Sequence, residues 1–276
     1  MLEDNIARPW LDSYDPNVSF HLDYESLPLF AYLDRAAEQH PRRPAVVFQN
    51  LKLNYAQLKK RAELVAANLT RLGVKKGDRV AIMLPNLPQT VISYWGALKA
   101  GAVVVMTNPL YMEKELVHHF TDSGSQVLIT LDRLWPRISS LWDKLGLTTC
   151  ITTSVGDGLK FPLNVLYRIK AKREGTAVKV DFDAQRVLPW KALFSKQASY
   201  EPVQAEPSQD LAVLQYTGGT TGVAKGVMLT HDNLSANVQQ CMAVLYDIGD
   251  EPEVFLGLLP FFHVYGLTVC VNFATA

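Results

Sequence analysis

Cysteine is scarce in this 276-residue chain, and neither sign of charge is in excess. Lys and Arg together number 27, as do Asp and Glu, so the formal net charge is zero. A general nucleic-acid binder needs surplus positive charge to neutralise phosphates, so this balance argues against that class. The three cysteines, Cys150, Cys241 and Cys270, lie far apart without a Cys-x-x-Cys pair. We interpret them as buried thiols in a reducing compartment, because this spacing suits neither a disulfide framework nor a zinc site.

The N-terminus lacks the pattern of a secretory signal. Glu3 and Asp4 stand where such a signal needs positive charge followed by an apolar run. One uncharged stretch, residues 254–276, is long enough to span a membrane. Polar and helix-breaking residues interrupt it, namely Gly257, Pro260, His263, Gly266 and Asn272. We therefore predict a strand, a turn and the start of a buried helix here.

Hydrophobic residues make up 48% of the chain, which is enough for a sizeable core. Short apolar runs alternate with amphipathic segments from Leu27 to about Ile151. The runs predict strands at 45–48, 79–84, 102–106 and 126–130, with a hairpin return at 51–53. Helical spacing predicts helices over 29–37, 54–73, 89–100 and 113–122.

Continuous apolar strands that alternate with helices are typical of a parallel sheet covered on both faces. We therefore predict an α/β fold with doubly wound, mostly parallel sheets and flanking helices. Such sheets bind ligands beyond the carboxyl ends of their strands, so the loops at Pro85-Asn86 and Thr107–Pro109 are candidate walls of a site.

The domain organisation is suggested by a change of pattern after the fifth strand run. Polar residues and prolines interrupt the pattern over residues 156–207, and a strand pattern begins again at 210–215. We predict a first α/β subdomain over 1–208, with 156–207 as a basic and hydrophobic excursion, and the start of a second over 209–276. The most apolar segment lies at the end of the chain, so we expect an incomplete N-terminal portion.

The most specific segment is YTGGTTGVAKGV, from Tyr216 to Val227. Glycines let backbone N–H groups approach a phosphate, threonine hydroxyls add neutral donors, and Lys225 adds a point charge. The spacing is not that of a Walker A loop, which needs Lys directly after the second Gly and a hydroxyl after the Lys. Composition alone supports a phosphate loop and a plain Gly/Thr hairpin equally.

This segment resembles the phosphate-loop signature of the adenylate-forming enzymes, which comprise acyl-CoA synthetases, firefly luciferase and adenylation domains of peptide synthetases. Gly218 replaces the usual Ser and Ala224 the usual Pro, a spelling similar to that of bacterial long-chain fatty-acid–CoA ligases. Further segments resemble family motifs in the same order, at 53–58, 97–110 and 259–267. The resemblance extends over residues 27–267 and implies the incomplete N-terminal domain of such an enzyme.

The resemblance implies a two-step acid–thiol ligase reaction. A fatty carboxylate attacks the α-phosphorus of ATP and releases pyrophosphate, and the coenzyme A thiolate then captures the acyl-adenylate. It implies ATP, Mg²⁺ and coenzyme A as cofactors, with Thr217 at the Mg²⁺ site beside a glutamate that the chain lacks. The phosphate-binding residues would be Tyr216, Thr217, Gly218, Gly219, Thr220, Thr221, Gly222 and Lys225.

The segment around His263 would serve the acid substrate. By the resemblance, His263 orients the carboxylate or gates its tunnel, and with Lys225 it is a candidate catalytic residue. Tyr265, Gly266 and Leu267 would line the acyl pocket. Ordinary core packing explains these three equally well. Met228 and Met242 are expected in the core rather than at a cofactor.

A basic and apolar segment, Lys160–Arg173, is a candidate for contact with a membrane surface. It could lie in a membrane interface with its basic residues toward anionic headgroups, or form an ordinary surface helix. With the resemblance, it implies a cytoplasmic enzyme, peripheral on the inner face of the membrane. A homodimer remains open.

Two other interpretations remain. One is an aryl- or medium-chain acid–CoA ligase, and the other is a truncated non-catalytic module that binds a membrane or a partner. Full members of the family carry adenine, ribose and coenzyme A contacts and a catalytic lysine beyond the point where this chain ends. We therefore expect the 276 residues alone to be inactive and prone to self-association.

Overall fold

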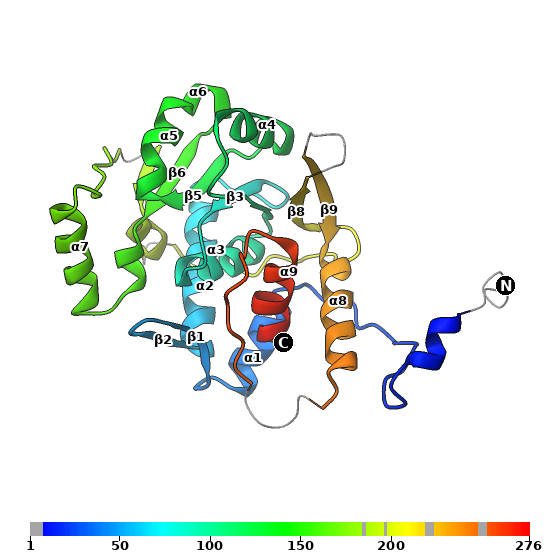
Figure 1. The fold of residues 1–276 in the computed structure, drawn as a ribbon. Helices are drawn as coiled ribbons and strands as arrows, with labels where there is room; N and C mark the ends of the chain where they lie inside the picture. Colours follow the sequence, from blue (N-terminus) through cyan, green and yellow to red (C-terminus); the bar gives the residue numbers. More distant parts are fainter. Residues whose placement is uncertain (1–7, 184–185, 196–197, 219–223, 248–252) are drawn as a thin grey trace.

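A central sheet organises the computed structural model, which describes residues 8–183, 186–195, 198–218, 224–247 and 253–276. Its seven strands follow the order β7-β6-β5-β3-β4-β8-β9, and all are parallel except β9, which is antiparallel to β8 (Figure 1). The strands are β3 (Arg79–Met83), β4 (Val103–Met106), β5 (Val127–Leu131), β6 (Thr149–Thr153), β7 (Val187–Pro189), β8 (Leu211–Thr217) and β9 (Lys225–Thr230). The prediction of an α/β fold with a mostly parallel sheet is confirmed.

Helices cover both faces of this sheet. Side chains alternate along β3, so Val80 and Ile82 enter one apolar cluster while Ala81 and Met83 enter the other. The first cluster receives residues of α1 (Ala31–Gln39), α2 (Tyr55–Arg71), α3 (Pro88–Lys99), α8 (His231–Val244) and α9 (Val264–Leu267). The second receives residues of α4 (Glu113–Ser123), α5 (Trp135–Ser140) and α6 (Trp142–Leu145).

Local signals in the sequence set several of these boundaries. The Asn54 side chain accepts from the Gln57 N–H at 2.8 Å, and Gln57 Oε1 accepts from the Asn54 N–H at 3.1 Å, so α2 begins with a reciprocal cap. A separate antiparallel hairpin of β1 (Pro44–Phe48) and β2 (Leu51–Asn54) precedes this cap. Gly124 ends α4 with φ of 63°, a left-handed conformation that favours glycine.

Strands from both sides of residue 208 share the central sheet. Residues 156–207 contain η3 (Val155–Gly158) in part, α7 (Leu163–Arg173), β7 and η4 (Trp190–Phe194). β7 pairs with β6 and so returns this segment to the sheet edge. β8 pairs with β4, which places the phosphate-loop segment at the other end of the same sheet.

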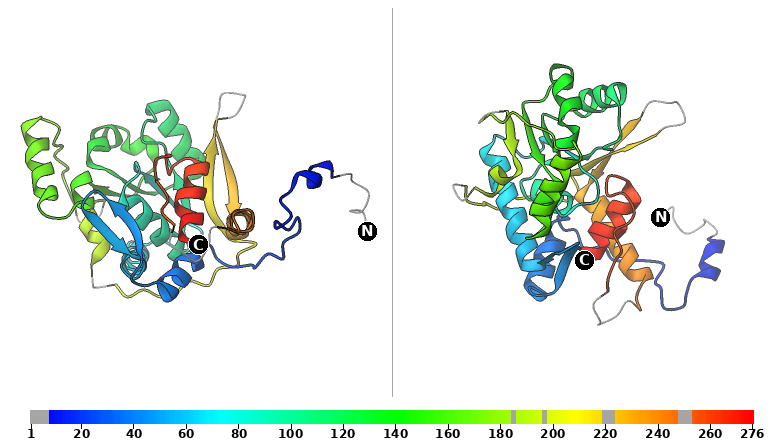
Figure 2. Two further views of the ribbon diagram at one scale, coloured as in Figure 1. Left: turned by 60° about the horizontal axis from the view of Figure 1, so that its bottom comes forward. Right: turned by 60° about the vertical axis from the view of Figure 1, so that its left-hand side comes forward.

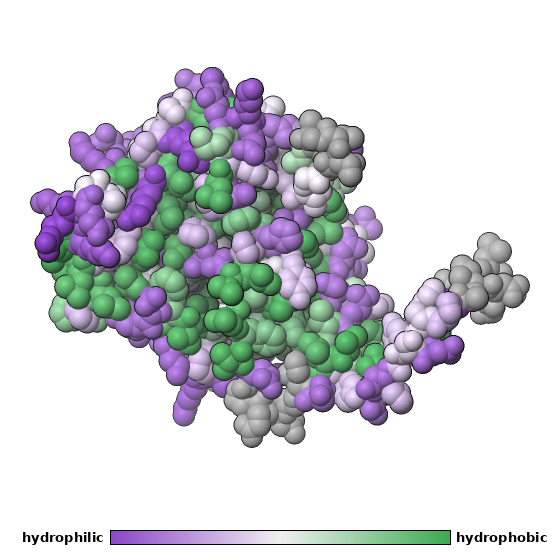
Figure 3. Space-filling model, viewed as in Figure 1, coloured by the Kyte–Doolittle hydropathy of each residue, from purple (hydrophilic) through white to green (hydrophobic). Residues whose placement is uncertain are grey.

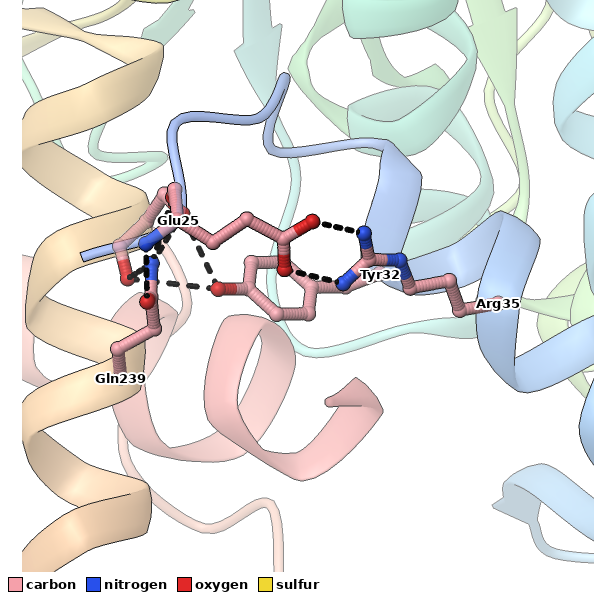
Figure 4. Close-up of polar contacts among 5 residues, drawn as sticks. Glu25, Tyr32, Arg35 and Gln239 are labelled. Atoms are coloured by element: carbon pink, nitrogen blue, oxygen red, sulfur yellow. Dashed lines mark hydrogen bonds and ion pairs between the residues drawn. The ribbon is translucent and has the colours of Figure 1, made fainter. Parts of the chain in front are cut away.

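An N-terminal arm runs past α8 before α1 begins (Figure 4). The Glu25 N–H donates to Gln239 Oε1 at 2.9 Å, and Gln239 Nε2 donates back to the Glu25 carbonyl at 2.9 Å. The Glu25 carboxylate pairs with Arg35 of α1. Upstream of these contacts, η1 (Pro9–Ser13) extends away from the body of the molecule (Figure 2).

The last segment departs from the sequence prediction. Residues 254–259 form no strand and pair with none of the described strands. Val254 is 92% exposed, although α9 and the π-helical η5 (Thr268–Phe273) that follow contribute to the core. The prediction of a buried helix start here is confirmed.

Two predictions of burial are wrong. Cys150 is buried in the sheet, but Cys241 and Cys270 are only partly buried, although all three thiols are free. Met228 is 68% exposed on β9, which is an edge strand of the described sheet, and Met242 is also exposed on α8.

Candidate functional site

The phosphate-loop segment links two paired strands. In the β8–β9 hairpin, Thr217 lies opposite Lys225 and Tyr216 lies opposite Gly226. Thr217, Gly218 and Lys225 are exposed, whereas Tyr216 is buried. The predicted residues Gly219, Thr220, Thr221 and Gly222 lie outside the described residues. The hairpin therefore presents a hydroxyl and an ammonium group together at the carboxyl end of β8.

Helix α4 contacts both ends of this hairpin turn. The Tyr216 hydroxyl donates to Asp122 Oδ2 at 2.5 Å, and His118 Nε2 donates to the Ala224 carbonyl at 2.8 Å. Burial, and then the bond to Asp122, raise the pKa of Tyr216 well above its ordinary value. Tyr216 is therefore a neutral donor that fixes the start of the turn.

The buried His119 ring packs against the Tyr216 ring. Their ring centroids lie 4.1 Å apart, and His119 Nε2 is 2.9 Å from Thr107 Oγ1 in the loop after β4. Burial lowers the pKa of His119 to about 4, so this ring is neutral near pH 7. The Thr107–Pro109 loop, predicted as a wall of the site, thus adjoins the phosphate-loop hairpin.

Asn86, in the loop after β3, holds the segment that carries His263. Its Nδ2 donates to the carbonyls of Gly257 at 2.9 Å and Leu259 at 2.7 Å, and its Oδ1 accepts from the Phe261 N–H at 2.9 Å. Gln215 Nε2 of β8 donates to the Phe262 carbonyl at 3.0 Å. Two side-chain amides therefore dock this segment against the carboxyl ends of β3 and β8.

The predicted acyl-site residues divide between surface and core. His263 is exposed at the start of α9, where its Nδ1 accepts from the Tyr265 N–H at 3.4 Å. Tyr265 is exposed as well, whereas Gly266 and Leu267 are buried. A Cβ at position 266 would lie 2.3 Å from the Pro260 carbonyl oxygen, so only glycine fits there.

The residues present at the hairpin suit a polyphosphate better than a metal held by protein alone. Within the described ranges, no group of three His, Cys, Asp or Glu side chains is close enough to hold a metal ion. Mg²⁺ is usually held by one or two protein oxygens together with phosphate oxygens and water. Thr217 could contribute one hydroxyl to such a site, and Lys225 could contact the phosphates.

Several of these contacts could not be found from the sequence. The pattern around Tyr216 identifies the hairpin, but nothing in it indicates Asp122, which is 94 residues away. His118 and His119 lie on a helix that was identified only by its apolar spacing. The loop position of Asn86 after a buried strand was the one available signal, because it placed this residue at the ligand-binding edge of the sheet.

Known proteins are similar to this chain in sequence and in fold. The AMP-binding enzyme family model matches residues 33–276. The long-chain-fatty-acid–CoA ligase of Bacillus subtilis is 43% identical over 270 residues, covering 97% of this chain and 48% of that protein. The ligase of the same name from Salmonella typhimurium is 34% identical, again covering 97% and 48%. The chain spans about half the length of the curated relatives that it matches.

A solved structure shows the same fold. The crystal structure of a long-chain-fatty-acid–CoA ligase from Archaeoglobus fulgidus superposes with a TM-score of 0.68 at 23% identity. The match covers 95% of this chain and 47% of that one. The family match extends over most of the chain, and the sheet and its helices agree with it. The chain belongs to the AMP-binding enzymes, the adenylate-forming family.

Proposed function

We propose that this chain supplies the phosphate-loop and acyl-site half of an ATP-dependent long-chain fatty-acid–CoA ligase. The observation that carries the proposal is the pairing of Thr217, at the end of β8, with Lys225, at the start of β9. The His263 segment is joined to β8 through Gln215. The 43% identity to a bacterial ligase of that name supports the choice of reaction.

Each group has a role that its placement permits. Lys225 and the Thr217 hydroxyl would neutralise and orient the β- and γ-phosphates of ATP, which makes pyrophosphate a better leaving group. His263 would orient the attacking carboxylate from the neighbouring segment. Mg²⁺, bound with ATP, would add positive charge on the phosphates, with Thr217 as this chain's ligand. Coenzyme A would then take the acyl group from the adenylate.

The acid substrate can be tested directly. The protein encoded by the complete open reading frame should form coenzyme A thioesters from palmitate with a higher kcat/KM than from octanoate or 4-coumarate. Preference for octanoate or coumarate would replace the proposal with the medium-chain or aryl alternative. No ATP-dependent thioester with any of the three acids would overturn the enzyme proposal and favour a non-catalytic binding module.

We also propose that α7 docks on an anionic membrane surface. Its exposed apolar residues Val165, Leu166 and Ile169 fall within an arc of about 100° on the helix, with Phe161 exposed just before it. Lys170 and Lys172 flank this arc, and the basic residues gather toward the C-terminal end of the helix, where Figure 3 shows a hydrophilic surface beside a hydrophobic one. Among the described residues, no helix is both long and apolar enough to cross a bilayer.

Vesicle co-sedimentation tests this second proposal. The triple change Lys170→Gln, Lys172→Gln and Arg173→Gln should weaken binding to phosphatidylglycerol vesicles by about 100-fold, at roughly 1 kcal/mol per basic residue. The control changes three exposed lysines elsewhere, Lys52, Lys60 and Lys75, to Gln and should retain binding. Equal loss in both triples would show that overall charge, and not α7, decides binding to the inner face of the membrane.

We propose finally that residues 1–276 alone do not complete the reaction. They match 48% of the length of each of these relatives. A purified polypeptide of these 276 residues should therefore show no palmitoyl-CoA formation. Measurable turnover by that polypeptide would contradict this part of the proposal.

A further inference from the structure

A cavity of about 820 Å³ lies at the opposite end of the sheet from the phosphate-loop hairpin. Thr152 and Thr153 of β6 and Trp190 after β7 line it, so it opens at the carboxyl ends of two parallel strands. Its volume is within the range of about 300–1,000 Å³ that small-molecule sites occupy. Four strand spacings separate β6 from β8, roughly 19 Å at about 4.8 Å each. The cavity is therefore separate from the site described above.

One wall of the cavity carries a cation without a counter-ion. Arg61 of α2 lines it, is partly buried, and makes no ion pair or hydrogen bond with any other described residue. Its guanidinium lies 5.9 Å from the centre of the Phe194 ring, and burial lowers its pKa. A partly buried, unpaired guanidinium is costly, and an anion in the cavity would offset that cost.

The carboxylates that line the cavity do not pair with Arg61. Asp157 is occupied by Arg168 at 3.4 Å and by the Ser154 N–H at 2.9 Å. Asp132 accepts from the Arg133 N–H, and burial raises its pKa. Lys191 also lines the cavity and has no ion pair within the described ranges. Arg61 and Lys191 are thus available to an anion.

The lining also has an apolar and aromatic part, beside polar residues of β6 and α7. Phe182, Trp190 and Phe194 provide three rings, and Val178 and Val180 extend the same surface. Trp190 and Phe194 pack against each other with ring centroids 5.2 Å apart. A bare inorganic anion would leave the apolar surface that faces the cavity uncovered, and a neutral hydrocarbon would leave Arg61 without a counter-ion. The chemistry that satisfies both parts is an anionic group joined to an apolar chain.

We propose that this cavity binds an acyl amphiphile, either a long-chain carboxylate or its coenzyme A thioester. The choice of an acyl chain rests on the proposed function, whereas the anion and the apolar wall rest on the cavity itself. Arg168 and Asn164 of α7 line the cavity, while Val165, Leu166 and Ile169 of the same helix are exposed. The cavity thus lies behind the helix proposed to contact the membrane, where it would hold an acid before reaction or sense the product.

Brominated acyl chains test the proposal through Trp190. In the full-length protein, brominated palmitate should quench tryptophan fluorescence, and the Trp190→Phe variant should lose the part of the quenching that arises in the cavity. The Arg61→Gln variant should weaken this Trp190-dependent binding by at least 10-fold. The matched control, Lys60→Gln, changes an exposed neighbour on α2 and should leave it unchanged.

The same titration distinguishes the two sources of the acyl chain. Stronger quenching by brominated palmitate than by its coenzyme A thioester indicates an acid-loading site, and the reverse indicates a product-sensing site. If Arg61→Gln does not fold, Arg61→Lys and the exposed rim variant Phe182→Gln serve instead, with expected losses of a few-fold and about 10-fold.

Quenching that is independent of both Trp190 and Arg61 (or of their substitutes) would overturn the proposal. Because the readout is equilibrium binding, it is independent of catalysis. Arg61-dependent quenching in a protein that forms no thioester would retain the cavity proposal while the proposed function fails.

Discussion

At the scale of single residues, Gly266 shows how tightly the His263 segment is built. The Gly266→Ala variant should lose about 1–3 kcal/mol of unfolding free energy, because its Cβ would meet the backbone of Pro260 rather than a side chain that can move aside. Gly218→Ala is the control, since no atom lies within 4 Å of its Cβ. Urea denaturation of both variants measures the difference. Equal stability of the two variants would contradict the close approach at Gly266.

Two buried histidines predict a loss of stability in mild acid. Burial lowers the pKa of His119 and of His231 to about 4, below the ordinary 6.5. The unfolded chain therefore binds more protons than the folded one between pH 4 and pH 6.5. The neutral, buried histidines therefore contribute unfolding free energy that is present above about pH 6.5 and is lost as the pH falls toward 4. From pH 7 to pH 5, each histidine should contribute a loss of about 2 kcal/mol.

The His231→Gln variant tests this pH dependence. His231 Nδ1 accepts from the Leu29 N–H at 3.1 Å, a bond that the Gln oxygen can also accept. Urea midpoints measured at pH 7 and pH 5 should differ less in this variant than in the wild type. His40→Gln replaces an exposed histidine and should keep the wild-type difference. An unchanged pH dependence in His231→Gln would show that His231 is not the titrating group.

At the scale of elements, the contact between α4 and the β8–β9 hairpin links the scaffold to the candidate site. Removing either partner of the Tyr216–Asp122 bond should cost about 1.5–3 kcal/mol, since a carboxylate accepts it. A double-mutant cycle with Tyr216→Phe and Asp122→Asn should show a coupling of about 1–2 kcal/mol. Asp122→Asn should also raise KM for ATP more than KM for the fatty acid.

The control for this cycle is Asp143→Asn, an exposed carboxylate on α6. It should change neither stability nor KM. If Tyr216→Phe and Asp122→Asn are additive within about 0.3 kcal/mol, the bond does not couple α4 to the hairpin.

The elements themselves were largely predictable from the sequence. The apolar runs at β3, β4 and β5 and the cap at Asn54 depend on neighbours within a few residues, so periodicity and capping rules find them. The strand predicted in the segment from Val254 was wrong, because an apolar run forms a strand only when it pairs with another strand, and the carbonyls of Gly257 and Leu259 in this run accept from Asn86 instead. Met228 was wrongly expected in the core. It lies on β9, an edge strand of the described sheet, and the sequence alone does not show that this strand is at the edge.

The candidate site was predictable only in part. Motif spelling identified Tyr216, Lys225 and His263, since the residues of a motif are adjacent in sequence. The contacts that position them join residues between 47 and 175 apart, as for Gln215 and Phe262 or Asn86 and Phe261, and a single sequence contains no signal for such pairs. The domain boundary near residue 208 remains a prediction.

At the scale of the whole molecule, an exposed apolar surface remains near the C-terminal end. Leu256 and Leu258 are 81% and 77% exposed, next to Val254. A contiguous apolar patch of this kind favours association. The 276-residue polypeptide should therefore elute from size-exclusion chromatography as dimers or larger species. The double variant Leu256→Ser and Leu258→Ser should shift it toward monomer, and a clean wild-type monomer would contradict the prediction.

The most direct test of the central claim is palmitate-dependent exchange between ATP and pyrophosphate. The protein encoded by the complete open reading frame should catalyse this exchange, because adenylate formation is the first half of the proposed reaction. Lys225→Ala should lower kcat/KM for ATP by at least 100-fold, while Lys52→Ala, an exposed lysine on β2, should leave it unchanged. Exchange that is absent in the wild type, or equal in Lys225→Ala and Lys52→Ala, would contradict the assignment of the β8–β9 hairpin as the ATP-binding loop.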